Sequence, residues 1–415
     1  MSFSSASSSF AASDKDLTKV AEVRELVADA GLHPALLGDL SLLRWLKQNR
    51  FDVEATSARL RNHAVFRRYL GLDREDASGF QLNPILSRSW PFCWTGARDR
   101  FGSPIAIRCA GTVDIQGNLR SVKTSDYVRH EMYQSERVMR HLREEEATQN
   151  RGNVGMCVLL DMDGFHFDPY VLSLLTNYFQ KLEEIIVHHN FPLIDERIIL
   201  INAPRLFATI YGLLKRMWPS IKIHIFDHNY QEKLLELIAP DQLLERFGGT
   251  MKESELATPF ILPQKVLAKD LYDPAKDDTE VTKIQVKAHR CLRFLTPDIP
   301  KGSRVSWYFR GDHDIAFTVY RIKEINNNAN GECGSKAENE APVKEEEMLY
   351  PKLRSKTDQV PEVGSMEAPN KGVYAMDFCN GHSRFMSKSV FVRLEVVTPS
   401  GKAIELTETE LASNA

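Results

Sequence analysis

The feature that most constrains this chain is a run of four apolar residues, 198–201, inside the segment RIILINAP. A strand with no polar face must be covered on both sides. The segments SPIAIRCA, GMCVLLDMD and IKIHIFD have the same character, and helical patterns separate them. Apolar strands that alternate with helices predict an α/β fold with a largely parallel sheet buried on both faces.

Helical spacing dominates the chain before this region. Apolar residues recur every three or four positions from residue 16, again over 40–47, and again in FDVEATSARLRNHAVFRRYLGLD, which begins at Phe51. We therefore expect a small all-α domain at residues 16–73, followed by the α/β domain at residues 74–253. Residues 1–15 are rich in serine and are expected to be a disordered tail.

After residue 253 the composition changes twice. Proline and charge fill residues 254–280, which predicts a linker. Residues 281–398 contain short β-branched or alternating runs, which predict an all-β domain. Its polar tract at about 327–368 is poor in apolar residues and is expected to be a disordered insertion, and residues 399–415 to be a C-terminal tail.

Charge and cysteine content narrow the class of protein. The 53 basic and 56 acidic residues nearly balance, so no global field favours nucleic acid as a partner. The six cysteines show no CxxC spacing, which predicts a reducing compartment and no zinc site. No signal peptide and no apolar run of about 18 residues is found in the sequence, which predicts a cytosolic or peripheral membrane protein.

One segment resembles a catalytic motif. VLLDMDGFHFD places Asp161 and Asp163 after an apolar strand, as in haloacid-dehalogenase-like phosphatases that use two carboxylates over a magnesium ion. Such a motif normally opens its domain, and here it does not. The simpler interpretation is that both carboxylates shape a turn. His188 and His189 are adjacent and point in different directions on a helix, so they cannot share a metal. We expect no catalytic residue, metal or cofactor, and the phosphatase remains a remote alternative.

Two helical segments carry unusually much apolar surface. In RLFATIYGLLKRMW, residues 205–218, apolar side chains cover most of the circumference, and residues 170–187 are similar. A helix that is apolar nearly all round is buried on both sides or faces an apolar ligand. Two core helices over a sheet and a hydrophobic cavity between helices and sheet are both consistent with this pattern.

Several segments together resemble a known family. LLRWLKQNRFDVEATSARLRNHAVFRR, VLLDMDGF, NFPLIDERIILINAPRLF and IKIHIFDHNYQEKLLELIAPDQLLERFGG are similar, in this order, to the CRAL-TRIO family of lipid-binding and lipid-transfer proteins. IPKGSRVSWYFRGDHDIAFTVYRI and NKGVYAMDFCNGHSRFMSKSVFVRLEV resemble a GOLD domain, a β-sandwich. The combination resembles the supernatant-protein-factor-like or tocopherol-associated-protein-like subgroup.

The resemblance implies a lipid pocket. The strand that ends in INAP is expected to form part of its floor, and the helix at 205–218 to be a mobile gate. Phosphoinositide-binding members carry an acidic residue where this chain has Leu193, so phosphoinositide binding is doubtful and a neutral phospholipid or isoprenoid gains weight. Candidate headgroup contacts are Lys222 and His224. The expected pocket and gate residues are Leu175, Phe179, Leu182, Ile186, Ile199, Ile201, Phe207, Ile210, Tyr211, Leu213, Leu214 and Met217.

These expectations lead to a function. The sequence predicts non-enzymatic binding and transfer of a hydrophobic lipid at cytosolic membrane surfaces, including those of the Golgi, with the GOLD domain as an adaptor to a protein or a membrane. The alternative is a lipid-sensing scaffold that recruits a Golgi or signalling partner without net transfer. The expected partners are therefore a lipid ligand, a membrane surface and a protein bound through the GOLD domain.

Overall fold

The computed structural model describes residues 13–74, 79–149, 154–166, 168, 180–204, 222–277, 279–325 and 343–412. The chain divides into two compact units. The first unit comprises the described residues up to Ala64 together with Leu72–Val122 and Asp126–Leu271, and the second comprises Val65–Gly71, Lys123–Ser125 and the described residues from Tyr272 onward.

The predicted N-terminal helices are present. Ser13 begins the first of them with a capping box, because its hydroxyl accepts from the Asp16 amide while the Asp16 carboxylate accepts from the Ser13 amide. Val20, Val23 and several leucines of the next helix form one apolar core. The elements are α1 (Asp14–Leu26), the 3₁₀ turn η1 (Pro34–Leu36), α2 (Asp39–Gln48) and α3 (Val53–Leu70).

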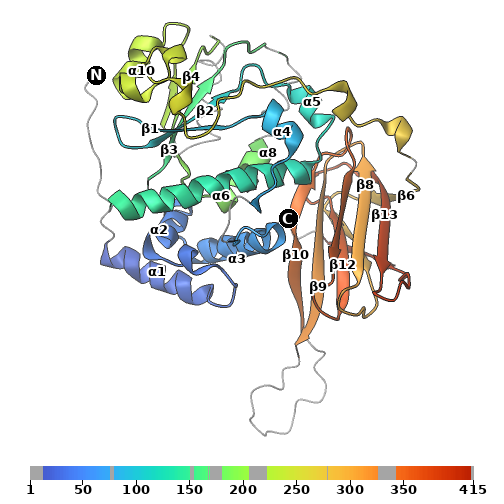
Figure 1. The fold of residues 1–415 in the computed structure, drawn as a ribbon. Helices are drawn as coiled ribbons and strands as arrows, with labels where there is room; N and C mark the ends of the chain where they lie inside the picture. Colours follow the sequence, from blue (N-terminus) through green and yellow to red (C-terminus); the bar gives the residue numbers. More distant parts are fainter. Residues whose placement is uncertain are drawn as a thin grey trace. The chain divides into compact units, whose positions relative to one another are not determined.

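A five-stranded sheet forms the centre of the first unit, in the order β1-β2-β3-β4-β5 (Figure 1). The pairs from β2 to β5 are parallel, and only β1, which the sequence pattern did not predict, runs antiparallel to its neighbour. The prediction of a largely parallel sheet is therefore confirmed. The strands are β1 (Cys93–Arg98), β2 (Pro104–Cys109), β3 (Met156–Asp161), β4 (Asp195–Ile201) and β5 (Lys222–Ile225).

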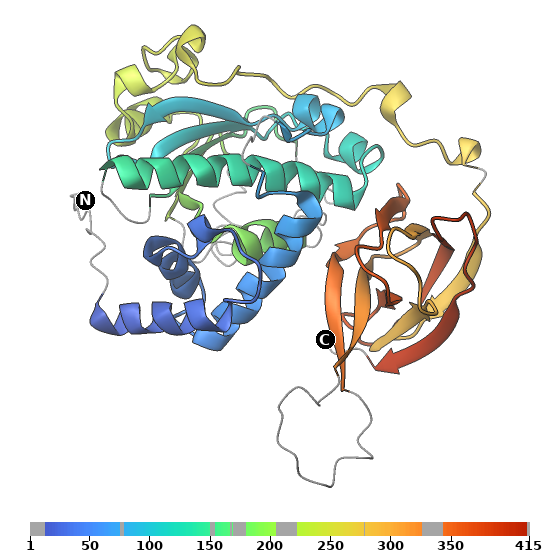
Figure 2. The ribbon, with the colours of Figure 1, turned by 60° about the horizontal axis from the view of Figure 1, so that its bottom comes forward.

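Helices cover both faces of this sheet, as the apolar strands require (Figures 1 and 2). On one face, strand residues such as Leu159 and Ile199 share a core with Leu234 and Leu237 of α10 (Gln231–Leu237). The long helix α6 (Thr124–Gln149) crosses the other face. Within the described ranges, no helix is both long and apolar enough to cross a membrane. The remaining helical segments of the unit are α4 (Pro84–Ser89), α5 (Ile115–Leu119), α8 (Gln180–Glu183), the π-helical turn η4 (Glu184–His188), η5 (Pro240–Gln242), η6 (Glu245–Phe247), η7 (Glu253–Glu255) and η8 (Ala268–Asp270).

Most of the segment predicted to be a linker is attached to the first unit. The Thr258 amide donates to the Trp94 carbonyl at 3.0 Å, so the chain runs alongside the edge strand β1. Further on, the Gln264 amide donates to the Arg88 carbonyl at 2.9 Å. The unit continues to Leu271. Backbone hydrogen bonds of this kind require no apolar periodicity in the sequence. For this reason the proline and charge content of the segment predicted only a linker.

The second unit contains two antiparallel sheets, with strand orders β10-β9-β12-β7-β14 and β11-β8-β13-β6. Aromatic rings fill its core: the Phe317 ring centroid lies 4.9 Å from that of Phe378 and 5.0 Å from that of Phe309. The predicted all-β texture is present. The first strands are β6 (Thr282–Val286), β7 (Arg290–Leu295), β8 (Arg304–Gly311) and β9 (Ile315–Ile325), preceded by the turn η9 (Pro274–Lys276), and β12 (Val373–Cys379) and β13 (Lys388–Val397) follow later in the chain.

The polar tract predicted to be a disordered insertion contains two strands, so this expectation needs correction. β10 (Val343–Ser355) pairs antiparallel with β9, and β11 (Glu362–Glu367) pairs antiparallel with β8. Tyr350 and Leu353 of β10 are buried. The charged residues of β10 led to the prediction of disorder. In the structure they form cross-strand ion pairs, such as that of Glu347 with Lys323 at 3.2 Å. Residues 326–342 of the tract lie outside the described residues.

The predicted C-terminal tail also contains a strand. β14 (Thr407–Ala412) pairs antiparallel with β7 along its length. The Glu410 carboxylate accepts from the Lys287 ammonium at 2.8 Å. All but one of the β14 residues are exposed, so the segment has no apolar pattern that sequence analysis could detect.

The cysteines do not all remain free. Cys291 of β7 and Cys379 of β12 are directly opposite in the strand register and form a disulfide, with a Cα–Cα distance of 4.1 Å. This differs from the expected set of unpaired cysteines in a reducing compartment. Spacing could not predict the bond, because the two residues are 88 positions apart. Cys93, Cys109 and Cys157 are free and buried.

Candidate functional site

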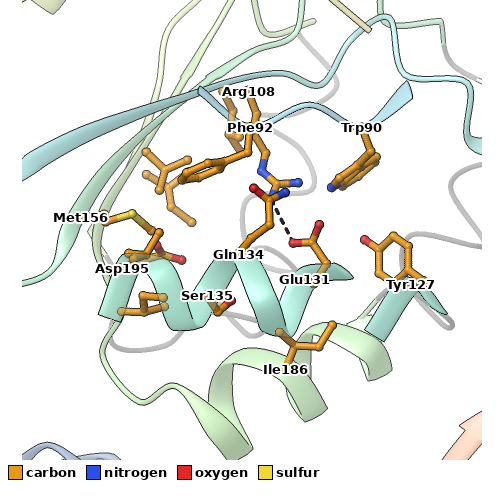
Figure 3. Close-up of a pocket in the computed structure, with 15 residues that line it drawn as sticks. Trp90, Phe92, Arg108, Tyr127, Glu131, Gln134, Ser135, Met156, Ile186 and Asp195 are labelled. Atoms are coloured by element: carbon orange, nitrogen blue, oxygen red, sulfur yellow. Dashed lines mark hydrogen bonds and ion pairs between the residues drawn. The ribbon is translucent and has the colours of Figure 1, made fainter. Parts of the chain in front are cut away.

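A cavity of about 160 Å³ lies between α6 and the central sheet (Figure 3). In Figure 3, Glu131 and Gln134 point from α6 toward Trp90 and Phe92, and Ile186 approaches from a neighbouring helix. The walls are mostly apolar or aromatic, and a few polar groups converge among them. The lining residues are Trp90, Phe92, Arg108, Tyr127, Glu131, Gln134, Ser135, Val138, Met156, Val158, Leu160, Ile186, Ile194, Asp195 and Ile198.

Strand alternation decides which residues reach this cavity. Ile198 of β4 lies beside Val158 of β3 in the parallel register, and both side chains face α6. Successive side chains of a strand point to opposite faces. Ile199 and Ile201, both expected in the pocket floor, therefore lie on the other face, where they are fully buried in the core that includes α10. β4 lines the cavity with Asp195 and Ile198, and not with Ile199 or Ile201.

An ion pair crosses the cavity from the sheet to the helix. Arg108 of β2 donates from Nη2 to Oε2 of Glu131 on α6 at 2.9 Å, with the two side chains only 17% and 14% exposed (Figure 3). The guanidinium carbon also lies 5.5 Å from the ring centroid of Trp90 and 5.2 Å from that of Phe92. Both charges are compensated, so the cavity carries no net charge from this pair.

Asp195 adds a titratable group at the first residue of β4. Its Oδ1 is buried and has no hydrogen-bond partner among the described residues. Burial raises the pKa of the Asp195 carboxyl to about 7, whereas the charge of Arg108 favours the ionised form and limits the rise. Near neutral pH both forms are populated. The carboxyl can therefore donate or accept a hydrogen bond inside the cavity.

A second cavity, of about 400 Å³, shares Phe92, Gln134 and Val138 with the first. One of its residues is His130, whose Nε2 lies 3.1 Å from the amide nitrogen of Gln134. Burial lowers the pKa of His130 to about 4, so the imidazole is neutral at neutral pH. The other lining residues are Leu82, Ser87, Pro91, Trp94, Arg137, His141, Thr258, Pro259 and Ile261.

The helix that supplies Ile186 is held at its C-terminal end. There the backbone forms the π-helical turn η4, a geometry that occurs often at functional sites. Asn190 follows it and donates from Nδ2 to the Ile185 carbonyl at 2.6 Å, while its Oδ1 lies 2.9 Å from His63 Nδ1. Ile186 lines the cavity, and its contact with a lipid stays a prediction. Leu182 is buried but is not among the residues that line it.

Comparison with known protein families gives a match over the region that contains the sheet and the cavity. Residues 87–249 match the family model described as the CRAL/TRIO domain. The chain contains a CRAL-TRIO domain. The matched residues include the whole central sheet and every residue that lines the first cavity.

Relatives cover more of the chain than this domain. A CRAL-TRIO domain-containing protein of Caenorhabditis elegans is 26% identical over 320 residues, which is 74% of this chain and 76% of the relative. The protein ctg-1 of Caenorhabditis elegans is 25% identical over 374 residues, 87% of this chain and 92% of its own length. A phosphatidylinositol/phosphatidylcholine transfer protein of Arabidopsis thaliana is 28% identical over 254 residues, 57% of this chain and 39% of its own length.

Several predicted pocket residues cannot be placed. The gate helix expected at 205–218 and most of the helix expected at 170–187 lie outside the described residues. The roles assigned to these residues therefore stay predictions. They are Leu175, Phe179, Phe207, Ile210, Tyr211, Leu213, Leu214 and Met217.

The two candidate headgroup residues lie on the α10 side of the sheet. Lys222 and His224 of β5 are in register with Arg197 and Ile199 of β4, so they share a face with Ile199 and lie opposite the cavity. The Lys222 side chain is 64% exposed, and its Nζ is 3.8 Å from Oε1 of Glu196. Burial lowers the pKa of His224, and the charges of Arg197 and Lys222 lower it further.

The first carboxylate of the phosphatase-like motif, that of Asp161, has structural partners. The Asp161 carboxylate accepts from the Asn202 side-chain amide at 2.8 Å and from the Asp163 backbone amide at 3.0 Å. For Asp161 this is the turn-shaping role that the simpler interpretation predicts for both carboxylates. Among the described residues, no group of three or more His, Cys, Asp or Glu side chains is arranged to hold a metal ion.

Sequence analysis missed the polar residues of the CRAL-TRIO cavity. Arg108, Glu131 and Asp195 come from three separate elements, and no motif links them. One signal was available on α6: Tyr127, Glu131, Gln134 and Val138 recur at helical spacing and define a second helix face. The apolar stripe through Val128, Met132, Met139 and Leu142 concealed this face, because it forms the more obvious buried side.

Proposed function

We propose that this protein binds a hydrophobic lipid in its CRAL-TRIO domain and exchanges it at cytosolic membrane surfaces, without catalysing a reaction. The observation that carries the proposal is the cavity between α6 and the sheet, in which apolar walls surround a single compensated ion pair. Ligand sites for lipid-like molecules combine apolar walls with a few placed polar groups. The likeness to a phosphatidylinositol/phosphatidylcholine transfer protein supports the same class of ligand.

The charge of the cavity favours a neutral or zwitterionic lipid. Arg108 is already paired with Glu131, so it offers no free cation to a phosphoinositide headgroup. Lys222 lies on the opposite face of the sheet, close to Glu196. Leu193 occupies the position where the family resemblance implies an acidic residue in phosphoinositide binders. A neutral phospholipid or an isoprenoid is therefore the proposed ligand.

The volume of the cavity requires a change of shape on loading. About 160 Å³ is less than the 300–1,000 Å³ that is typical of sites for drug-sized ligands. The proposed route of enlargement is movement of the gate helix at 205–218, and the shared side chains Phe92, Gln134 and Val138 offer a second route into the neighbouring cavity. Each route predicts that lipid uptake depends on side-chain size in the cavity.

The second unit is proposed to be a GOLD domain that acts as an adaptor to a protein or a membrane. Its two antiparallel sheets are consistent with a β-sandwich, and the likeness to ctg-1 extends over 87% of the chain. The competing proposal is a lipid-sensing scaffold, which binds lipid and recruits a partner but moves no lipid between membranes.

Lipid exchange between donor and acceptor liposomes tests the proposal. Native mass spectrometry of the purified protein first identifies the co-purified lipid, and a fluorescent analogue of that lipid then reports transfer. Ser135→Leu places extra carbon atoms in the cavity and is expected to reduce loading and transfer. The control is Thr148→Leu, which introduces the same side chain at an exposed position of the same helix.

Three outcomes are distinguishable. Catalytic transfer that Ser135→Leu slows and Thr148→Leu leaves unchanged supports a carrier. Lipid in the mass spectrum without transfer favours the sensing scaffold. No lipid from any source, with both variants folded by thermal melt, contradicts lipid binding in this cavity. For the gate, a folded Leu213→Asp variant that transfers lipid at the wild-type rate contradicts the role assigned to residues 205–218, because a charge on a membrane-contacting helix is costly.

A further inference from the structure

The loop that joins β12 to β13 carries the most exposed large apolar side chain among the described residues. Phe385 is 92% exposed and Met386, beside it, is 55% exposed. No other large apolar residue in the described part of the chain exceeds the 51% of Leu262. Scattered apolar side chains on a surface are usually half-covered by neighbours, whereas a phenyl ring this free has almost no protein contact.

The loop backbone holds these two side chains outward. Asn380, at its start, donates from Nδ2 to the Met386 carbonyl at 2.8 Å. The Ser383 hydroxyl also donates to that carbonyl, at 2.9 Å, and lies 3.2 Å from the Met386 amide. The chain is thus tied together on both sides of Phe385. The exposed ring therefore lies on a loop whose backbone is held in place by hydrogen bonds.

A second connection supports the tip from the side. His289, in the turn between β6 and β7, has its Nε2 3.2 Å from the Arg384 carbonyl. Asn380 also reaches the Val286 carbonyl, at 3.1 Å. Phe385 therefore projects from an end of the second unit where two loops are joined by hydrogen bonds.

A cationic residue, Arg384, lies next to the apolar tip in the chain. Arg384 precedes Phe385, is exposed, and has no ion pair or hydrogen bond from its guanidinium within the described residues. At the base of the loop, the Lys388 ammonium donates to the Asp314 carboxylate at 2.9 Å, and Arg354 contacts the same carboxylate. The charge of Asp314 is thus compensated by two cations. Arg384 remains available to an external anion.

We propose that residues 380–387 dock this protein onto anionic phospholipid bilayers, with Phe385 and Met386 inserted among the acyl chains and Arg384 at the headgroup phosphates. The proposal rests on the adaptor role proposed above and names its partner. An aromatic tip with a neighbouring cation suits the membrane interface, where one end of the group is apolar and the other is wet.

The size of the tip favours a bilayer over a protein. A stable protein interface buries about 800 Å² on each partner, and a Phe side chain contributes only about 150–250 Å². Two adjacent apolar residues on a protruding loop cannot supply that area. A bilayer requires no matching shape, and it accepts a protruding side chain at any lateral position.

Sedimentation of the full chain with vesicles tests the proposal. The probes are vesicles of phosphatidylcholine alone and of phosphatidylcholine with phosphatidylserine. Phe385→Ser/Met386→Ser is expected to weaken binding to the mixed vesicles by about tenfold or more, because both apolar anchors are lost. Arg384→Gln is expected to weaken binding several-fold on the mixed vesicles only. Val363→Ser, at a 44% exposed apolar residue of β11 in the same unit, is the control and should bind as wild type.

A fluorescence measurement shows directly where the tip lies. Phe385→Trp adds one indole to the five tryptophans of the chain, and the added emission is expected to shift to the blue on vesicle binding and to be quenched by brominated phospholipids. Equal vesicle binding by wild type and the double Ser variant would overturn the proposal. So would a concentration-dependent dimer that the double variant abolishes, because the loop would then bind a second copy.

These readouts separate the docking from the lipid-carrier function. Vesicle binding by the loop without any lipid in the cavity would contradict the carrier and leave the docking intact. Suppose instead that the protein loads and transfers lipid, and that wild type and the double Ser variant bind vesicles equally. This result would support the carrier and contradict the docking.

Discussion

Asn202 donates a 2.8 Å hydrogen bond from its side-chain amide to the Asp161 carboxylate, which joins the carboxyl ends of two neighbouring parallel strands, β3 and β4. The Asn202 backbone is left-handed, with φ of 52°. Asn adopts this conformation more readily than most residues. The abrupt end of the apolar strand at INAP therefore has a local cause, and the bond fixes the point where the chain enters the proposed gate.

Replacing Asn202 tests both parts of this arrangement. Asn202→Ala is expected to lower the free energy of unfolding by about 2–4 kcal/mol, because it loses a hydrogen bond to a charged group and places a Cβ-bearing residue without local compensation in a left-handed conformation. Asn202→Gly removes the same hydrogen bond but relieves the backbone, so its loss should be smaller. Urea denaturation measures both variants. Equal losses would show that the backbone conformation contributes nothing.

The pair Arg108–Glu131 gives a prediction about the cavity. Arg108→Met leaves the Glu131 carboxylate largely buried without its partner and is expected to cost about 2–4 kcal/mol of unfolding free energy, below the full cost for a completely buried pair. The double variant Arg108→Met/Glu131→Met should recover most of this loss. Lys181→Met breaks the exposed pair with Glu184 at 3.2 Å and should cost less than about 1 kcal/mol.

A double-mutant cycle decides how the pair contributes. Additive losses from Arg108→Met and Glu131→Met would contradict direct coupling between the two side chains. The double variant is also expected to keep binding a neutral lipid, because the cavity keeps its apolar walls. Loss of neutral-lipid binding in a folded double variant would show that the pair itself contacts the ligand.

Asp195 predicts a pH dependence of stability. Its pKa is raised from 3.8 to about 7 in the folded protein, so between these values the folded state holds a proton that the unfolded state has released. The contribution of Asp195 to stability is fully present below about pH 4 and is lost as pH rises to about 7, by at most about 1.4 kcal/mol per pH unit. Asp195→Asn removes this loss. Its thermal melts should exceed those of wild type increasingly from pH 4 to pH 7, and a constant difference would show that Asp195 does not titrate in this window.

The parallel sheet was predictable because its strands are apolar throughout and alternate with helices. The same property hid the site. In a run such as 198–201 both faces are apolar, so the sequence does not reveal whether Ile198 or Ile199 faces the cavity beside α6. That choice depends on the side of the sheet on which α6 packs, which is a tertiary relationship.

Strands with charged outer faces were not predicted, because they lack the continuous apolar pattern that made the parallel sheet predictable. β10 contains three glutamates and β14 contains two, and a high content of charged residues is associated with disorder. Their side chains pair with basic residues far away in the sequence, as Glu410 does with Lys287 of the β6–β7 turn, 123 residues away. Arg108 and Glu131 pose the same difficulty at the site, because only the folded chain brings β2 next to α6. The local sequence pattern indicates secondary-structure propensity and burial. It does not indicate which charged residues far apart in the sequence will form ion pairs.

The last prediction concerns the tract between β9 and β11. Ile325 and Val343 are opposite in the β9–β10 register, so the ends of the intervening segment are adjacent and a short turn can join them. Replacing residues 327–341 with a short glycine-containing turn is expected to keep the fold and to raise the free energy of unfolding by up to about 1 kcal/mol, because a shorter loop loses less entropy on closure. Deleting residues 327–368 instead removes β10 and β11, including the buried Tyr350 and Leu353, and should unfold the second unit. Circular dichroism and limited proteolysis distinguish the two variants. A folded second unit in the long deletion would contradict the structural role assigned to β10 and β11.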